Sequence, residues 1–152
     1  MKGRDLAISL VVVLVIGIFT VAGFVRAAET DAAYQAIADG AKQMMEGNKK
    51  VMAKMSAKGM KDAELTAAEK MMTDGYDMIM KGEGMLATNK AEAQKMASQG
   101  GKMMMDAQKR VAADVEKKGM TQVCYDDFAQ CSLGEKKIKE GALQWFFGSP
   151  SL

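Results

Sequence analysis

Apart from one continuous apolar run near its beginning, the chain places its apolar residues at alternating spacings of three and four. This spacing is typical of a helix that buries a single face. No period-2 alternation of apolar and polar residues outside the apolar run predicts a strand. Four helical stretches can be traced, with inward-facing positions at Tyr34, Ile37, Ala41, Met44, Asn48, Val51 and Met55; at Leu65, Ala68, Met72, Gly75, Ile79, Gly82 and Leu86; at Met104, Gln108, Val111 and Val115; and at Cys124, Phe128, Cys131, Glu135, Ile138, Ala142 and Trp145.

Residues that typically cap helices separate these stretches. Gly59 and Gly119 each follow a lysine and predict the end of a helix. Four helices joined by short turns lie antiparallel to their neighbours, so the predicted fold class is all-α, an up-down-up-down four-helix bundle. Helical hairpins that complete a coiled-coil core by oligomerising are the alternative. The starts of the second and third helices are predicted by Asp62, or by Thr66 with Glu69, and by Asn89 with Glu92.

The bundle is predicted to be built from a duplicated unit of about 60 residues. Residues 40–60 and 100–120 align without a gap, and ten of the 21 positions are identical, including the closing Lys-Gly-Met. We place the first copy at about 30–87 and the second at about 88–147. Repeats of this length are supersecondary units that bury their apolar faces against one another.

Glycine recurs at seven-residue spacing within the predicted helices. Each glycine weakens a helix by about 1 kcal/mol relative to alanine. On a core face, glycine either lets two helix backbones approach closely or leaves the helices loosely packed, and the sequence leaves both outcomes open. The pairs are Gly40/Gly47, Gly75/Gly82 and Gly134/Gly141.

Residues 6–25 form an apolar run of 20 residues without a charged side chain, preceded by Lys2 and Arg4. Such a run is long enough to cross a bilayer, and its positive flank is typical of the cytoplasmic side. Small and β-branched residues after the run also suit a signal peptidase. We therefore expect residues 1–27 to be a signal peptide or a membrane anchor, and residues 28–152 to be exported to the periplasmic or extracellular face.

Residues 28–152 carry 18 basic and 18 acidic side chains with the two signs interspersed. This composition provides neither a positive stripe for nucleic acid nor a polybasic patch for anionic lipid. We expect no nucleic-acid partner. The remaining partner predictions are a membrane, through residues 6–25 if that segment is retained, the subunits of a membrane complex, and self-association.

Methionine is unusually abundant in residues 28–152, which hold 15 methionines and only five leucines. Exchange of leucine for methionine costs little in packing, so one interpretation is a core filled with flexible apolar side chains. Thioethers also bind soft cations such as Cu(I) and Ag(I). An oxidant sink and an adaptable surface for partner helices are two further roles for these side chains.

The predicted bundle brings several sulfur atoms to one level. Because the first and third helices run parallel, Met44 and Met104 should lie at the same height across the core. Counting back from the two Lys-Gly-Met turns places the segment from Met72 to Met78, and Cys131, near that layer. The sequence therefore predicts a candidate soft-metal site for Cu(I) or Ag(I) that consists of Met44, Met45, Met72, Met104, Met105 and Cys131.

Cys124 and Cys131 are the two cysteines of the chain. In an oxidising compartment such a pair usually forms a disulfide. Seven residues on a continuous helix separate the α-carbons by about 10.5 Å, beyond the roughly 7 Å that a disulfide tolerates. A local disulfide therefore requires a loop that shortens the fourth helix, and this is the outcome we favour. Disulfides between chains and reduced thiols in a core or metal site are the alternatives.

Trp145, Phe146 and Phe147 form an aromatic group before the Gly-Ser-Pro stop. Trp145 is predicted to close the bundle core. In an up-down bundle the last helix ends beside the start of the first, next to residues 6–25. The three aromatic side chains would also suit a lipid–water interface or a partner subunit there.

The sequence gives little support for catalysis. No histidine is present to act as a general base or as a common zinc ligand. Neither a phosphate-binding loop nor a dinucleotide-binding glycine pattern occurs. We predict a non-enzymatic protein, most concretely one that binds or buffers a soft metal ion. A membrane-anchored scaffold or accessory subunit that presents helices to a partner complex is the alternative.

Overall fold

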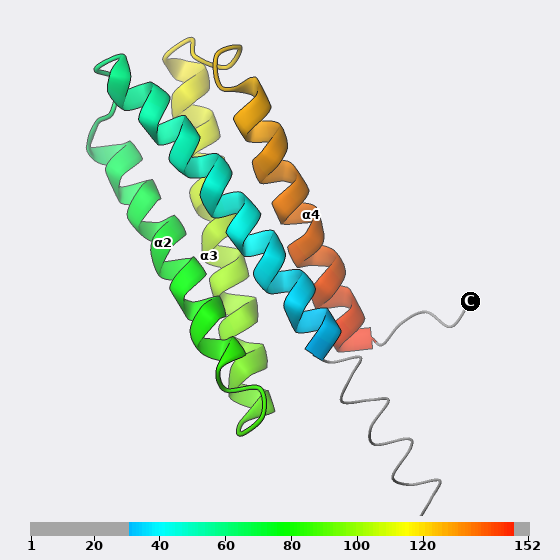
Figure 1. The fold of residues 1–152 in the computed structure, drawn as a ribbon. Helices are drawn as coiled ribbons and strands as arrows, with labels where there is room; N and C mark the ends of the chain where they lie inside the picture. The colour runs from blue at the N-terminus through cyan, green and yellow to red at the C-terminus, as the bar shows by residue number, and fades with distance from the viewer. Residues whose placement is uncertain (1–30, 148–152) are drawn as a thin grey trace, which may run out of the picture.

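The computed structural model describes the backbone of residues 31–147 and the side chains of residues 31–145. These residues form four α-helices and no strand, which confirms the all-α prediction (Figure 1). The predicted signal peptide or anchor at 1–27 lies outside the described residues. Within the described part, no helix combines the length and the apolar character needed to cross a membrane. The helices cover residues 31–57, α2 at Ala63–Glu83, α3 at Lys90–Lys117 and α4 at Tyr125–Phe147.

The helix ends follow the predicted capping residues. The Asp62 carboxylate accepts hydrogen bonds from two backbone amides in the first turn of α2, and the Asn89 side chain accepts one from the Glu92 amide at the start of α3. Gly59 and Gly119 adopt φ angles of 67° and 68°, in the left-handed region that favours glycine. After each, the following methionine amide donates 2.9 Å back to a carbonyl five residues earlier. The chain therefore reverses direction in the same way at both turns.

Consecutive helices run in opposite directions, and the α4 C-terminus lies beside the start of the 31–57 helix (Figure 1). Two glycine contacts hold the helices in close pairs. A Cβ built on Gly40 would lie 2.6 Å from the Gly134 carbonyl oxygen, and one built on Gly75 would lie 2.7 Å from that of Gly100. The 31–57 helix thus touches α4 backbone to backbone, and α2 touches α3 in the same way. Of the two outcomes for the core glycines, close approach is the one observed.

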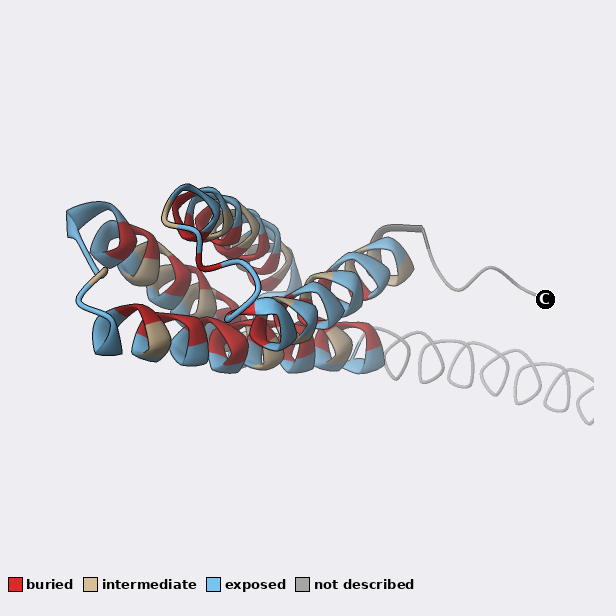
Figure 2. Ribbon diagram, turned by 90° about the horizontal axis from the view of Figure 1, so that it is seen from above, coloured by how far each residue is buried: buried red, intermediate tan, exposed pale blue. Residues whose placement is uncertain are grey.

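The buried side chains form two apolar clusters along the bundle, lining the inward faces of the helices (Figure 2). The larger cluster lies toward the end that holds Tyr34 and Ile138, and the smaller toward the turns at Met60 and Met120. Asn48 and Gln108 are buried. Each follows, along its helix, the residues of the larger cluster and precedes those of the smaller one. The core is therefore apolar at both ends and interrupted by amide side chains.

The predicted inward face of α4 was wrong by one residue over part of its length. Asp127, Gly134 and Gly141 are buried, whereas the predicted positions Phe128, Glu135 and Ala142 are partly exposed. The physical reason is the close approach of the 31–57 helix, because glycine lets its backbone contact the carbonyls of Gly40 and Ala33 directly.

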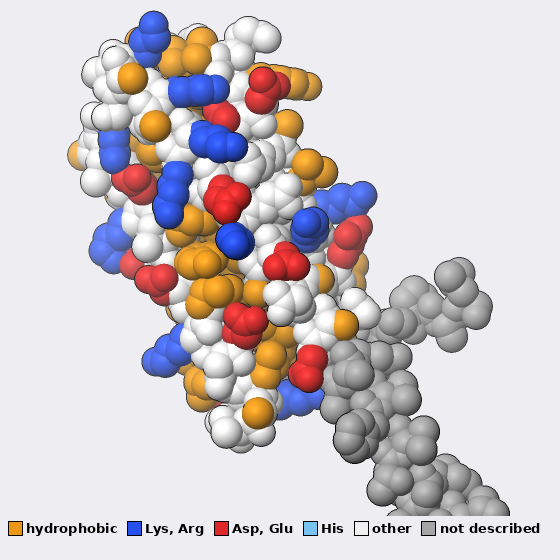
Figure 3. Space-filling view, in the orientation of Figure 1, with side chains coloured by type: hydrophobic (Ala, Val, Ile, Leu, Met, Phe, Trp, Pro, Cys, Tyr) orange, Lys and Arg blue, Asp and Glu red, His pale blue; other side chains and the backbone are white. Residues whose placement is uncertain are grey.

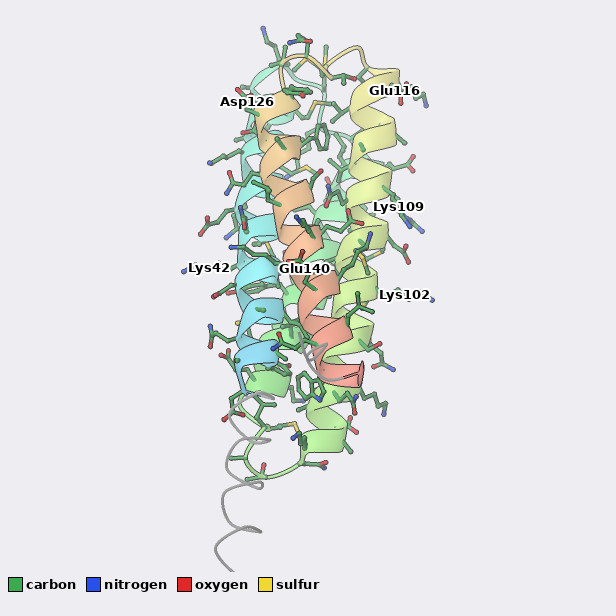
Figure 4. The ribbon with its side chains drawn as sticks, turned by 90° about the vertical axis from the view of Figure 1, so that its right-hand side faces the viewer. Lys42, Lys102, Lys109, Glu116, Asp126 and Glu140 are labelled. Carbon is green, nitrogen blue, oxygen red and sulfur yellow. The ribbon has the colours of Figure 1, made fainter. Side chains whose placement is uncertain are left out.

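Charged side chains cover the outside of the bundle. The face seen in Figure 3 mixes lysine and arginine with acidic groups, without a region of one sign. Lys102, Lys109 and Glu116 point outward from α3, and Asp126 and Glu140 lie on the outside of α4 (Figure 4). One ion pair reaches inward between helices, where the Lys54 Nζ lies 2.6 Å from the buried Asp127 carboxylate.

Candidate functional site

Four helices each bring one sulfur-bearing side chain of the predicted site into the interior. Met44, Met72 and Met104 are 0% exposed and belong to one contiguous apolar cluster. Cys131, from α4, is 1% exposed. We call these four residues the sulfur layer.

Glycine residues on the facing helices make room for this layer. The Met44 Cγ lies 2.7 Å from the place that a Cβ on Gly134 would take, and the Met104 Cγ lies 2.8 Å from the equivalent place on Gly75. The Cys131 Sγ occupies the corresponding place beside Gly47, at 2.6 Å. Because these glycines have no side chain, each sulfur-bearing side chain packs directly onto the neighbouring backbone.

The Cys131 thiol links α4 to the 31–57 helix. Its Sγ donates to the carbonyl oxygen of Met44 across 3.6 Å. Burial, with a smaller contribution from the nearby Asp127 carboxylate, raises the pKa of Cys131 to about 12. The thiol is therefore protonated at neutral pH unless a cation takes the place of its proton.

The two remaining methionines of the predicted site differ from each other. Met45 is 7% exposed and belongs to the same apolar cluster as the sulfur layer. Met105 is half-buried and lines a pocket of about 120 Å³ between α3 and α4, together with Trp145. Met45 is therefore part of the larger cluster, whereas Met105 packs against that cluster and also lines the pocket.

The loop required for a local disulfide is not formed. The α4 helix begins at Tyr125 and continues through Cys131 without a break. Both cysteines are buried and free. Cys124 packs in the smaller apolar cluster, and burial also raises the pKa of its thiol. Of the three outcomes considered for these residues, the structure has the free thiols.

A pair of buried amides lies one helical turn from the sulfur layer. Asn48 follows Met44 by four residues, and Gln108 follows Met104 by four. The Asn48 Nδ2 and the Gln108 Oε1 have no hydrogen-bond partner among the described residues. Burial of an unpaired amide group costs about 1–3 kcal/mol, so packing alone gives no reason for these two side chains.

The aromatic end of α4 contacts the 31–57 helix. The rings of Tyr34 and Trp145 meet edge to face with centroids 4.8 Å apart. The Tyr34 hydroxyl donates to the Ile79 carbonyl oxygen at 2.6 Å, and burial raises the pKa of this phenol. Trp145 packs against the larger cluster, as predicted for a residue that closes the core. The side chains of Phe146 and Phe147 lie outside the described residues.

A second group of methionines was not predicted as a site of its own. Met78, Met96 and Met103 are half-buried and belong to neither apolar cluster, and their Cβ atoms lie close to the glycines that join α2 to α3. The sequence signal for them appears when the two halves of the chain are compared position by position, because the corresponding residues in the other half are polar or small.

The arrangement offers sulfur rather than oxygen or nitrogen ligands. Within the described residues, no three histidine, cysteine or acidic side chains gather closely enough to hold a metal ion. Comparison of the chain with protein-family models, with curated proteins and with solved structures found no match. The function of this protein is therefore inferred from its side chains and their packing.

Proposed function

We propose that this protein is an exported, non-enzymatic protein that binds Cu(I) or Ag(I) through the sulfur layer. The observation that carries the proposal is that Met44, Met72 and Met104, from three helices, are each 0% exposed and belong to one apolar cluster. The fourth helix contributes Cys131, whose thiol donates a hydrogen bond to the carbonyl oxygen of Met44. Thioether and thiolate sulfur select soft monovalent cations over hard ones.

The charge balance of the layer favours a monovalent ion. When Cys131 binds the metal, its S–H bond breaks, the proton leaves to solvent and a metal–sulfur bond forms. A Cu(I) ion and one thiolate together carry no net charge, whereas a divalent ion would leave an uncompensated positive charge in an apolar core. The three thioethers are neutral and add no charge in either case.

The correspondence between the two halves of the bundle supports a duplicated unit. Met44 and Met104 are 60 residues apart, and Met72 and Cys131 are 59 apart. Gly75 approaches Gly100 in the same way as Gly134 approaches Gly40. We infer that the sulfur layer consists of two pairs of equivalent positions, one pair of which has exchanged methionine for cysteine.

Export of the domain is part of the same proposal. It is supported by the charge-free run at residues 6–25 and its basic flank at Lys2 and Arg4. We propose the periplasmic or extracellular face as the site of action, where the protein would bind soft cations before they reach the cell interior.

The test replaces the ligands and keeps the apolar bulk. In one variant of the full-length chain, Met44, Met72 and Met104 are each changed to leucine. The matched control changes Met52, Met55 and Met120 to leucine, because these are also buried methionines but belong to the smaller cluster. Circular dichroism establishes that both variants remain helical, and competitive Cu(I) titration against a chromogenic chelator measures affinity.

We expect the first variant to lose at least 100-fold in Cu(I) affinity and the control to lose less than threefold. Equal affinity in the two variants would exclude the sulfur layer as the site. A wild-type chain that takes no Cu(I) from the chelator would overturn the proposed function as a whole.

A structural role is the second candidate, favoured by a different observation. Tyr125, Leu133 and Leu143 on α4 are more than half exposed, and Val123 beside it is 48% exposed. Such apolar side chains could dock onto a membrane-complex subunit or a second copy of the chain. A scaffold of this kind would tolerate the leucine replacements in the sulfur layer, so the same experiment separates the two functions.

A further inference from the structure

The contact between α2 and α3 has an inner side, which faces the bundle core, and an outer side, which faces away from it. A Cβ built on Gly75 would contact Met104 on the inner side and the Met103 Cβ, at 3.1 Å, on the outer side. One built on Gly100 would contact Ile79 on the inner side and the Met78 Cβ, at 3.2 Å, on the outer side. Methionine therefore flanks this glycine contact from both helices on the side away from the core.

The same arrangement recurs two turns further along α2. A Cβ built on Gly82 would lie 3.1 Å from the Met96 Cβ of α3. Met78, Met96 and Met103 are all half-buried, and none belongs to either apolar cluster. We call these three residues the outer methionine group.

The antiparallel direction of α2 and α3 brings these side chains toward each other. Long side chains on a helix lean toward the N-terminus of their own helix. Met78 on α2 and Met103 on α3 therefore lean toward the Gly75–Gly100 contact from opposite directions. The thioethers of Met78 and Met103 thus lean toward each other on the partly exposed side of the contact. Met96, seven residues from Met103, lies beside Gly82 on the same side.

The other half of the bundle provides an internal control for packing. The 31–57 helix and α4 touch through Gly40 and Gly134 in the same way. There, a Cβ built on Gly40 would meet the Lys137 Cβ at 2.9 Å, where its counterpart Gly100 has Met78. The positions that correspond to Met96 and Met103 are Ala36 and Gln43. A glycine contact of this kind is therefore formed without methionine on its outer side.

We propose that the outer methionine group is a second, solvent-accessible thioether site for Cu(I) or Ag(I). This inference rests on the proposed function and adds a place where the ion is first captured. Gly75 separates Met103 on the outside from Met104 in the sulfur layer, so the two sites lie on opposite sides of one helix contact. A site built only from neutral thioethers exchanges its ion without gaining or losing a proton.

The experiment counts bound ions in the full-length chain by native mass spectrometry during titration with Ag(I). One variant carries Met78→Leu, Met96→Leu and Met103→Leu. The matched control carries Met60→Leu, Met80→Leu and Met85→Leu, three half-buried methionines that pack against the apolar clusters. Leucine keeps the apolar bulk at all six positions and removes only the sulfur.

We expect the outer variant to bind at least one Ag(I) fewer than the wild-type chain and the control to bind the same number. If the outer variant binds as many Ag(I) ions as the wild-type chain, this inference is wrong. The three methionines would then serve as a partner-docking face or as an oxidant sink. That result would leave the proposed function standing if the sulfur-layer variant still lost binding. A wild-type chain that binds no Ag(I) would overturn both.

Discussion

At the scale of single residues, methionine and glycine act together in this core. Met44 and Met104 each place their Cγ beside a glycine of a facing helix. A flexible side chain such as methionine fits an irregular space of this kind. These two methionines therefore have a packing role, and the proposed metal chemistry depends on which sulfur atoms lie together.

Several residues could be assigned from the sequence because their roles are local. Asn89 caps α3 and Gly59 ends the 31–57 helix by interactions within a few neighbouring residues. The state of Cys131 could not be assigned, because it depends on Gly47, a residue distant in sequence whose missing side chain leaves space for the thiol. Met105 packs against the larger cluster and also lines a pocket that the sequence did not predict, because residues of α4 form part of its wall.

The thiol of Cys131 gives the stability of the protein a pH dependence. In the unfolded chain this thiol ionises near the ordinary pKa of a cysteine, 9.0, whereas burial raises its pKa in the folded state to about 12. The folded state then holds a proton that the unfolded state releases, so the stabilising contribution is complete below pH 9 and is lost progressively as the pH rises toward 12. The slope is at most about 1.4 kcal/mol per pH unit.

Urea unfolding between pH 8 and pH 11, with reductant present, measures this contribution. We expect the free energy of unfolding of the wild-type chain to fall more steeply above pH 9 than that of the Cys131→Ala variant. Parallel curves for the two proteins would show that Cys131 is not held as a protonated thiol in the folded state.

At the scale of helices, the proposed duplication relates the two halves of the chain with two different offsets. The 31–57 helix matches α3 at 60 residues, but α2 matches α4 at 59. Cys131 follows Gly119 by 12 residues, whereas Met72 follows Gly59 by 13, so the positions of α4 that correspond to the buried face of α2 lie one residue earlier than an offset of 60 gives. Once α4 is shifted, Gly134 corresponds to Gly75 and Gly141 to Gly82. The periodicity of α4 alone could not reveal this shift, because Phe128 and Ala142 are also apolar.

The glycine contact between α2 and α3 makes a measurable prediction. We expect Gly75→Ala to lower the free energy of unfolding by about 1–2 kcal/mol. Overpacking against the Gly100 carbonyl costs about 1–3 kcal/mol, and the better helix propensity of alanine offsets up to about 1 kcal/mol.

Gly84 is the matched control, since it is exposed at the end of α2, has a φ of −63°, and a Cβ there would make only an ordinary contact at 3.6 Å. Gly84→Ala should be neutral or slightly stabilising. Chemical unfolding of the two variants tests this. Equal stability would mean that the two helices do not depend on the glycine contact.

At the scale of the whole molecule, residue counting along antiparallel helices places Met44, Met72, Met104 and Cys131 at one height, and this common height stays a prediction. The three methionines belong to one buried apolar cluster. Which helices pair closely depends on glycine contacts between distant segments, such as Gly40 with Gly134. The outer methionine group follows from this pairing and was therefore not predicted.

The central claim is that the sulfur layer binds a soft monovalent cation. The most direct test is nuclear magnetic resonance of the full-length chain with ¹³C-labelled methionine methyl groups, assigned by single leucine variants, as the first equivalent of Ag(I) is added. The account predicts that the methyl signals of Met44, Met72 and Met104 shift together and that those of Met52 and Met55 in the smaller cluster do not. Unchanged signals from the three layer methionines at saturating Ag(I) would contradict it.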